Sequence, residues 1–544
     1  HYELEDKDAP VTINGVVYNE MKGAFSSPEG VLDRVVLNSL FPDTTYSNES
    51  GGDPEVIPEL TYEQYLDFHR EFYHPCNSYI YLYGNMDMDE KLEFLDKEYL
   101  SHYDKIEVDS AIQLQAPFEK PVTISKPYSI ASSESLEDNA YLSYNVAIGT
   151  NLESELTLAF DVLDYALLSA PGAPLKQALI DAGIGKDIMG GFDNSTLQPI
   201  FSVVAKNANK EDEEKFVGII EDTLKKIVKD GLNRKSLLAG INSEEFKFRE
   251  ADYGNFPKGL IYGLSCMDSW LYDDDEPFLY LKILDVFAAL KEGYFEELIQ
   301  KYLLDNSHKS YVSIEPEKGL NARLEKELEE KLAAYKKDLS EEEIDKLVED
   351  TKHLKQYQEE PSPKEDLMKI PMLKRQDMKR EAQPLVYEKV SCNGIETIHT
   401  NIYSNGIHYL NLMFDISDIT EEELPYLGVL KAVLGYMDTE HYNYADLANE
   451  INLMTGGISS QINIYADTKK KDSFHAKYEV RSKILYQNLE EGLRLLSEIL
   501  MGTQITDEKR LYEILARIKS RLQMSLSSAG HSVSAMRAMS YFSP

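Results

Sequence analysis

Cysteine is scarce in this sequence, and long apolar runs are absent. The three cysteines, Cys76, Cys266 and Cys392, are far apart and odd in number. We therefore expect neither a disulfide framework nor a cysteine-based zinc knuckle, a pattern that suits a reducing compartment. No stretch approaches the roughly 20 consecutive apolar residues of a membrane-spanning helix.

Positive charge is also in short supply. Lysine and arginine number 56 against 95 aspartate and glutamate residues, so the formal net charge is −39. Nucleic acid and anionic membranes would be repelled, and we expect neither as a partner. A basic peptide would be attracted, although strong acidity is also a common route to solubility.

Familiar catalytic motifs are missing. The sequence contains no G-x-x-x-x-G-K-[ST], no G-x-S-x-G and no dinucleotide-binding glycine pattern. None of its 11 histidines begins an H-x-x-E-H or H-E-x-x-H string. The acidic run at 273–276 is interpreted as a solvated loop. No catalytic residue is assigned, and no substrate-binding residue can be named.

What is present is an ordinary globular composition, 42% hydrophobic and 28% charged over 544 residues, enough for several domains. Hydrophobic periodicity predicts an α+β fold, with alternating strand patterns half-buried against helices. Strands are expected at 78–83, 121–126, 141–148, 199–205, 311–314, 385–390, 395–403, 408–416 and as a pair within 458–480. Helices are expected at 26–40, 61–74, 91–99, 155–168, 175–182, 211–230, 234–249, 286–302, 421–437, 443–454, 484–501 and 507–528.

The stretch from Gly15 to Gly23, GVVYNEMKG, is predicted to begin a helix. Val17, Met21 and Phe25 recur every fourth residue and would form one apolar stripe. Glu20 would then lie at the border of this stripe. Spacing alone favours an ordinary solvated helix glutamate at this position.

Local signals mark several helix boundaries and the loop between two of them. Ser27 is placed as an N-cap, and Thr61 begins a capping box that Gln64 completes. The polar loop at 42–58 contains adjacent glycines at 51–52, which allow a backbone to approach a ligand closely. His69 and His74 are interpreted as surface or packing residues, because five positions on a helix separate their side chains.

Internal self-similarity indicates that one α/β fold is used more than once. Residues 141–192 parallel 409–457, and 74–95 parallel 305–328. Between these copies, a charge-dense stretch predicts an antiparallel helical hairpin, with Ser340 and Glu343 as a second capping box. Residues 361–378 are interpreted as a linker.

The string GVVYNEMKG, together with FPDTTYSNESGGDP at 41–54, resembles the presequence protease-like branch of the pitrilysin and insulin-degrading-enzyme (insulinase) zinc metallopeptidase family. The resemblance implies that Glu20 is the distal zinc ligand, since the glutamate of the NEMKG string has that role in the family. It also implies pitrilysin-type (LuxS/metallopeptidase-like) domains, four in two halves joined by a helical hairpin.

By this resemblance, residues 1–118 form the last part of a first peptidase-type domain and 119–320 a second, inactive-type domain. Residues 321–384 would be the hairpin hinge and linker, and 385–544 a third domain of the same fold, with a fourth absent. The family's H-x-x-E-H segment lies upstream of the distal glutamate and is not in this sequence. We therefore interpret the chain as an internal fragment with an incomplete zinc site.

The implied parent enzyme is a zinc metalloendopeptidase that degrades unfolded peptides, plausibly basic ones, inside a chamber closed by its two halves. Zinc held by two histidines and one glutamate would activate a water for attack on a peptide carbonyl. The fragment itself is predicted to be inactive and monomeric, in the cytoplasm if bacterial or otherwise in the mitochondrial matrix or another organelle. The alternatives are a non-catalytic peptide-binding or scaffolding member of the same fold, and a stand-alone acidic peptide-binding module without metal.

Overall fold

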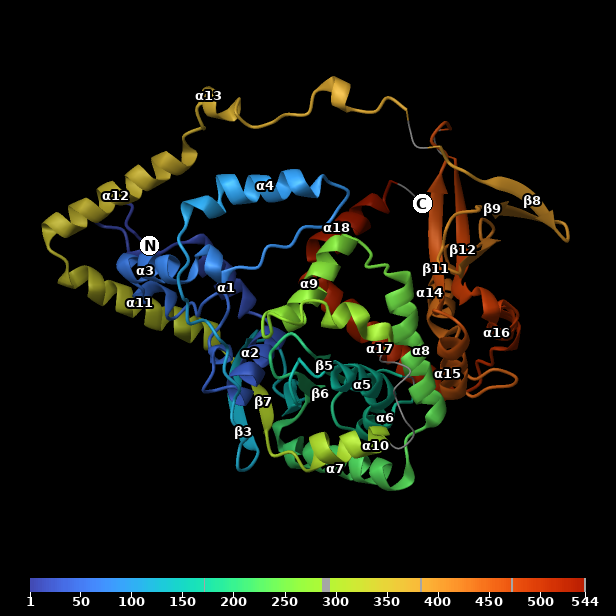
Figure 1. Ribbon diagram of the computed structural model, residues 1–544. Coiled ribbons are helices and arrows are strands. Elements are labelled where there is room, and N and C mark those ends of the chain that lie inside the picture. Colours follow the sequence, from blue (N-terminus) through green and yellow to red (C-terminus); the bar gives the residue numbers. More distant parts are fainter. Residues whose placement is uncertain (171, 286–293, 382–383, 471–472, 543–544) are drawn as a thin grey trace.

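The computed structural model describes residues 1–170, 172–285, 294–381, 384–470 and 473–542. Within these ranges the strands form sheets of two, five, two and three strands, and helices cover the larger ones (Figure 1). The predicted α+β class, with mostly antiparallel sheets, is confirmed.

The five-stranded sheet has the order β3-β7-β4-β6-β5, formed by β3 (Val122–Ile130), β4 (Ala140–Ala147), β5 (Asp187–Asp193), β6 (Ile200–Ala208) and β7 (Lys309–Lys318). Its β3–β7 pair is parallel and the other pairs are antiparallel. Strand β4 is buried along its whole length. This follows from its position, because helices lie on both faces of the sheet.

One face of this sheet packs against helices that follow β4 in the chain. They are α5 (Ser154–Asp164), α6 (Pro174–Asp181), α7 (Glu213–Asp230) and α10 (Tyr294–Leu298). The other face packs against α2 (Pro28–Leu40), whose buried Leu32, Val35, Val36 and Leu40 are the residues expected from its periodicity. Helix α2 thereby attaches the first 118 residues to the second unit.

The three-stranded antiparallel sheet has the order β10-β12-β11, formed by β10 (Ile407–Asp415), β11 (Ile458–Ala466) and β12 (Phe474–Leu485). Its helices are α14 (Leu424–Val433), α15 (Tyr444–Met454), α16 (Leu489–Gly502) and α17 (Glu508–Ser528). The elements follow one another as in β4-α5-α6-β5-β6-α7-α8, and β10 pairs with β12 as β4 pairs with β6. The duplication between 141–192 and 409–457 is therefore present in the structure.

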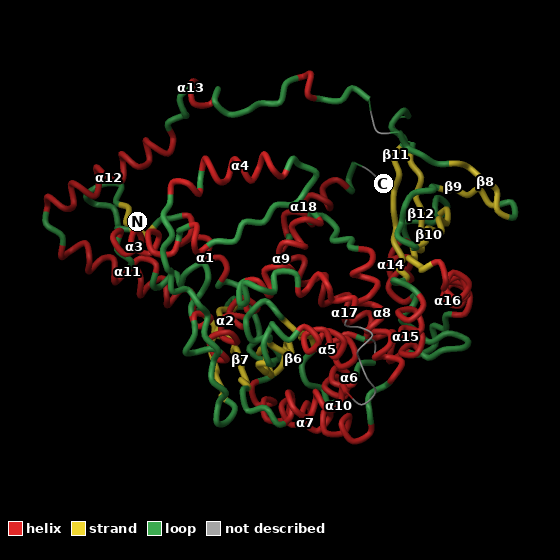
Figure 2. The backbone as a smooth tube through the Cα atoms, viewed as in Figure 1, coloured by secondary structure: helices red, strands yellow, loops and turns green. Residues whose placement is uncertain are grey.

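The predicted helical hairpin consists of α11 (Leu320–Asp338) and α12 (Glu341–Glu359), with the Ser340–Glu343 capping box formed. A small strand pair, β1 (Tyr2–Glu3) and β2 (Thr12–Ile13), packs on it through Leu4 and Val11 against Leu332. The linker that follows is exposed and contains only the short α13 (Lys364–Leu367) among its helices of the α type (Figure 2). It leads to the hairpin of β8 (Glu388–Cys392) and β9 (Ile395–His399).

Helix α8 (Arg234–Glu250) joins the second and third units by packing against both α5 and α15. Its Asn242 Nδ2 donates a hydrogen bond to the Leu453 carbonyl, and Lys235 forms an ion pair with Glu450 at 2.8 Å. Tyr165, at the end of α5, is hydrogen-bonded to Asn452. The two repeats are thus in direct contact.

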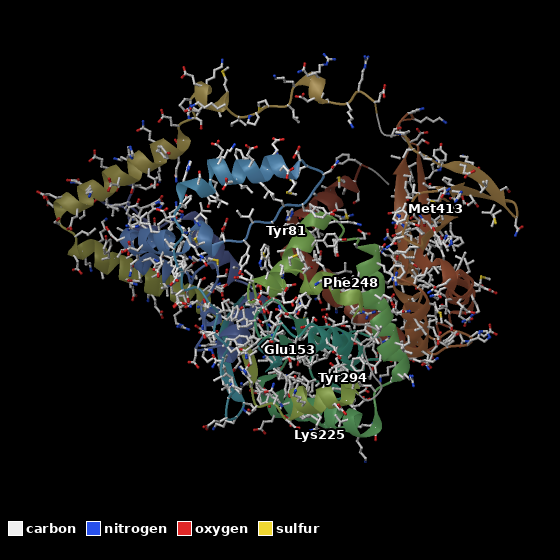
Figure 3. The ribbon with its side chains drawn as sticks, viewed as in Figure 1. Tyr81, Glu153, Lys225, Phe248, Tyr294 and Met413 are labelled. Atoms are coloured by element: carbon white, nitrogen blue, oxygen red, sulfur yellow. The ribbon has the colours of Figure 1, made fainter. Side chains whose placement is uncertain are left out.

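The strand predicted at 78–83 is wrong. The segment is extended but unpaired among the described residues, and its tyrosines pack on α9 (Lys258–Trp270) instead. Tyr83 lies against Gly259 and Tyr81 against Gly263, so the glycine face of a helix takes the place of a neighbouring strand. Figure 3 labels Tyr81 beside this helix. The expected parallel between 74–95 and 305–328 therefore holds for the helix and not for the strand.

Other differences are smaller. Helices α9 and α18 (Gly530–Met539) were not expected, and β5 begins inside the loop expected at 183–191. Residues 286–293 of the helix expected at 286–302 lie outside the described residues, and the remainder is helical. Helices α1 (Val16–Ala24), α3 (Tyr62–Phe72) and α4 (Met88–Glu98) match the predictions within a few residues.

Candidate metal-ligand site

Helix α1 carries Glu20, the predicted metal ligand. The buried stripe of α1 runs through Tyr18, Met21 and Phe25, with Tyr18 only 7% exposed. Val17 is 55% exposed, so its place in the predicted stripe is wrong. Because the stripe is shifted by one residue, Glu20 lies on the exposed side of the helix and not at the edge of the core.

Three contacts hold α1 in position. The Met21 side chain lies so close to Gly51 that a Cβ at residue 51 would overlap its sulfur. The Arg34 guanidinium stacks over Phe25 at 4.5 Å from the ring centroid and forms an ion pair with Asp53. The loop at 42–58 therefore packs on the helix that carries Glu20, and its glycine allows this close approach.

The Glu20 carboxylate is free of partners within the described part of the chain. It makes no hydrogen bond or ion pair there, whereas the preceding Asn19 donates a hydrogen bond to Asn14 Oδ1 at 2.9 Å. Lys22 turns back over the Tyr18 ring, with its Nζ 5.7 Å from the centroid. A helix that is fixed on one face thus presents an unpaired carboxylate on the other.

The described residues do not fit a zinc ion by themselves. No group of three or more histidine, cysteine, aspartate or glutamate side chains is placed to hold a metal in the ranges described. Protein zinc sites use three or four such ligands. Glu20 can supply one of them, so the site residue remains a prediction and no chemical step is derived through a metal here.

The histidines that invited a metal interpretation have other roles. His69 stacks on Tyr73 with ring centroids 4.6 Å apart. His74 accepts a hydrogen bond from the Cys76 backbone N–H at 3.2 Å and packs against Tyr103. Both are packing residues, as expected. His531, on α18, is exposed, and no catalytic role is assigned to it.

Three half-buried carboxylates escaped the sequence analysis. Burial and the nearby Glu244 raise the pKa of Asp161 to about 7. Burial likewise raises the pKa of Asp164 to about 6 and that of Asp268 to about 6. These residues come from α5 and α9, which are distant in sequence, so no local motif could reveal them.

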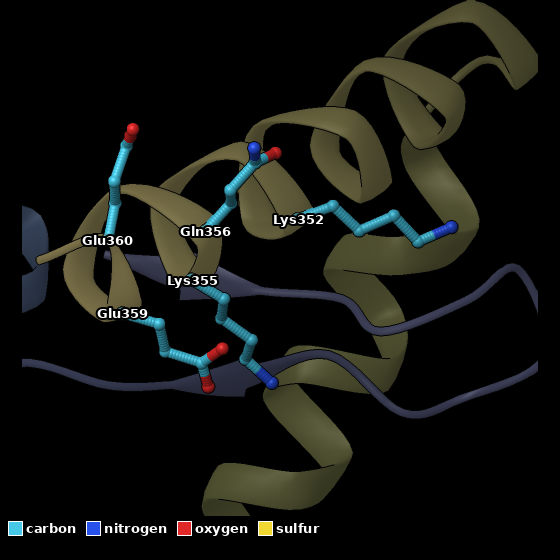
Figure 4. Close-up of a pocket in the computed structure, with 5 residues that line it drawn as sticks. All are labelled: Lys352, Lys355, Gln356, Glu359 and Glu360. Carbon is cyan, nitrogen blue, oxygen red and sulfur yellow. The ribbon is translucent and has the colours of Figure 1, made fainter.

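Two hollows lie away from Glu20. One, of about 590 Å³, follows the exposed end of α12 and is lined by Lys352, Lys355, Gln356, Glu359 and Glu360 (Figure 4). The other, of about 340 Å³, lies between α8 and the third unit and includes Asn242, Arg249 and Asn405. Neither contains a set of catalytic side chains among the residues that line it.

The described helices were also compared with the dimensions of a bilayer. None of them combines the length and the apolar character that crossing a membrane requires.

Comparison with known proteins gives consistent results. The family model "Peptidase M16 inactive domain" matches residues 59–243, and the model of the region associated with subfamily C of the same peptidases matches 314–544. The chain is 43% identical over 545 residues to Protein HypA of Clostridium perfringens. It is 32% identical over 549 residues to presequence protease 1, chloroplastic/mitochondrial, of Arabidopsis thaliana.

These matches cover 99% of this chain but 56% and 51% of the two relatives, so the chain spans about half the length of the curated relatives it matches. Among solved structures, pitrilysin aligns with a TM-score of 0.48 at 15% identity, over 94% of this chain and 52% of that one. Family models and relatives agree with the resemblance carried by the NEMKG string. The chain belongs to the insulinase (M16) family of peptidases, in its presequence protease-like branch.

Proposed function

We propose that this chain is part of a zinc-dependent metalloendopeptidase that degrades unfolded peptides, and that Glu20 is one of its zinc ligands. The observation that supports the role of Glu20 is its placement, unpaired on the exposed side of a helix whose other face is fixed by Gly51 and Phe25. Zinc supplies a polarised carbonyl and an activated water when it is bound. Glu20 contributes negative charge and one coordinating oxygen.

The other ligands and the general base belong, in this proposal, to an H-x-x-E-H segment elsewhere in the longer protein. The 544-residue chain alone is then inactive, because one carboxylate cannot hold zinc in a catalytic geometry. The names of the relatives, which include presequence proteases, support peptides as the substrate class. The net charge of −39 favours basic, unfolded peptides. We further propose a monomer, in the cytoplasm of a bacterium or in the mitochondrial matrix or another organelle.

The test of Glu20 is made in the full-length protein. Glu20→Gln keeps the size of the side chain and removes its charge, so zinc content measured by elemental analysis is expected to fall below one tenth of the wild-type value, with peptide cleavage lost. Glu71→Gln, on exposed α3, is the matched control and is expected to retain both. A Glu20→Gln protein with full zinc content would refute the ligand assignment.

A second candidate is a non-catalytic peptide-binding or scaffolding member of the same fold, and a metal-free peptide-binding module is a third. The strong negative charge supports binding of basic peptides without any chemistry. The full-length protein distinguishes the cases. Chelator-sensitive cleavage of a quenched basic peptide supports the peptidase, whereas tight binding that is indifferent to a chelator, without cleavage, supports the binding proteins.

A further inference from the structure

One face of α17 concentrates positive charge in a strongly acidic chain. Arg510, Arg517 and Arg521 are separated by seven and four residues, so they lie on the same side of the helix. Ile514 lies between them in the sequence and is 1% exposed, packed with Val433 and Met437. The buried isoleucine fixes the rotation of α17 and therefore the direction in which the arginine row points.

The second unit adds a fourth cation to this row. Lys509 Nζ at the start of α17 lies 3.6 Å from Asp181 at the end of α6, which brings the two helices together. Lys176 of α6 is half-buried, and its pKa is lowered by burial and by the charges of Arg517 and Arg521, with Asp187 opposing. We call Lys176, Arg510, Arg517 and Arg521 the cationic cluster.

Arg510 is fully engaged within the protein. Its guanidinium lies 4.0 Å from the centroid of the Tyr444 ring. It forms an ion pair with Glu513 at 3.1 Å and donates a hydrogen bond to the Tyr436 carbonyl at 3.2 Å. This arginine is therefore a structural member of the cationic cluster.

Arg517 is different, because its donors have no acceptor. The guanidinium is half-buried over the Tyr436 ring, 5.6 Å from the centroid, and no residue in the described ranges accepts a hydrogen bond from it or forms an ion pair with it. Burial, Arg521 and Arg510 all lower its pKa. Asp187 is attracted to it electrostatically, but that carboxylate lies 3.9 Å from Lys176.

A half-buried charge without a partner is costly, and five N–H donors in a planar fork are suited to one kind of partner. Arginine binds carboxylate and phosphate through two parallel hydrogen bonds. The net charge of −39 repels anions from the rest of the surface, so an anion has reason to bind only where the local charge is reversed.

We propose that the cationic cluster is an oxyanion-binding site, with Arg517 as the direct donor and Lys176 and Arg521 as flanking charges. Its ligand is a carboxylate, such as the C-terminal carboxylate of a peptide, or a free phosphate, which also presents a pair of oxygens to the arginine fork. The site joins the two repeats, so an occupant would link α6 to α17. The inference goes beyond the proposed peptidase function, because it requires neither zinc nor cleavage.

The test uses the 544-residue chain and calorimetric titration at low salt. Three probes are compared: inorganic phosphate, a basic peptide with a free C-terminus, and the same peptide amidated. Arg517→Met is expected to weaken binding of the preferred probe at least tenfold. Lys519→Met removes one charge from an exposed position of the same helix and is expected to leave the affinity unchanged.

The probes distinguish the two sources of the anion. Preference for the free-acid peptide over its amide identifies a peptide carboxylate, and binding of phosphate with no such preference identifies a phosphate site. The proposal is overturned if no probe binds, or if Arg517→Met and Lys519→Met bind alike. Thermal unfolding guards against misfolding: the bound anion should raise the melting temperature of the wild type only. If Arg517→Met does not fold, the exposed Arg521→Met decides by the same criteria.

Discussion

The ring of Phe246 in α8 lies directly over Gly456, which follows α15, so closely that a Cβ at residue 456 would overlap it. The contact is between the two repeats, and it accompanies the Asn242 hydrogen bond to Leu453 and the ion pair of Lys235 with Glu450. The junction of the second and third units therefore depends on the absence of a side chain at one position.

Gly456→Ala is expected to separate α8 from α15. The added methyl group must displace an aromatic ring packed in the interface, and overpacking of this kind costs about 1–3 kcal/mol. Thermal unfolding should show a lower melting temperature, and amide exchange should increase in α15. Gly428→Ala in α14 is the control, because its Cβ would meet nothing within 4 Å. Equal effects of the two substitutions would contradict the interface.

Helix starts were the most predictable part of the fold. Ser27 accepts a hydrogen bond from the Gly30 N–H, and the capping boxes at Thr61 and Ser340 both form. Each motif is complete within four residues, so its physics is local. The repeat between 141–192 and 409–457 was also visible, since each copy keeps the order of its strand and helix patterns.

Contacts between distant segments could not be predicted. The periodicity of α1 allowed two stripes, and only the presence of Gly51 beside Met21 selects the one that leaves Val17 and Glu20 exposed. Residues 78–83 have the composition of a strand, but packing against the glycines of α9 decided their conformation. The raised pKa of Asp161 depends on burial and on Glu244, more than 80 residues away. The arginine row of α17 was the exception, since its helical spacing is present in the sequence.

Gly51→Ala is expected to disturb the candidate metal-ligand site without touching Glu20. A Cβ at residue 51 would overlap the Met21 side chain, so α1 must shift or Met21 must adopt another rotamer. Amide exchange across α1 should increase, and zinc content of the full-length protein should fall. Gly23→Ala, on α1 itself, meets nothing within 4 Å and should leave both unchanged. Normal zinc content in Gly51→Ala would show that the loop does not position Glu20.

Asp161 should make the stability of the second unit depend on pH. Its pKa is raised from the usual 3.8 to about 7, so the folded state favours the protonated form. The stabilisation is complete below about pH 4 and is lost as the pH rises through about 7. Asp161→Asn cannot ionise and should raise the melting temperature by several degrees at pH 8 and by little at pH 5. Exposed Asp230→Asn should change neither value by more than a degree or so. A gain that is the same at both pH values would refute the role of Asp161.

Leu332 should determine whether the β1–β2 strand pair stays on the helical hairpin. Its side chain is 7% exposed and packs with Leu4 and Val11, so truncation leaves a cavity at this contact. Leu332→Ala is expected to cost about 2–4 kcal/mol locally. Leu324→Ala, on the same helix but 39% exposed, should cost about 0.5 kcal/mol or less. Amide exchange at residues 2–13 measures the effect, because release of the strand pair frees its backbone hydrogen bonds. Since the same segment leads directly into α1, faster exchange there would also spread towards Glu20, whereas an effect confined to α11 would show that the hairpin and the candidate metal-ligand site are mechanically independent.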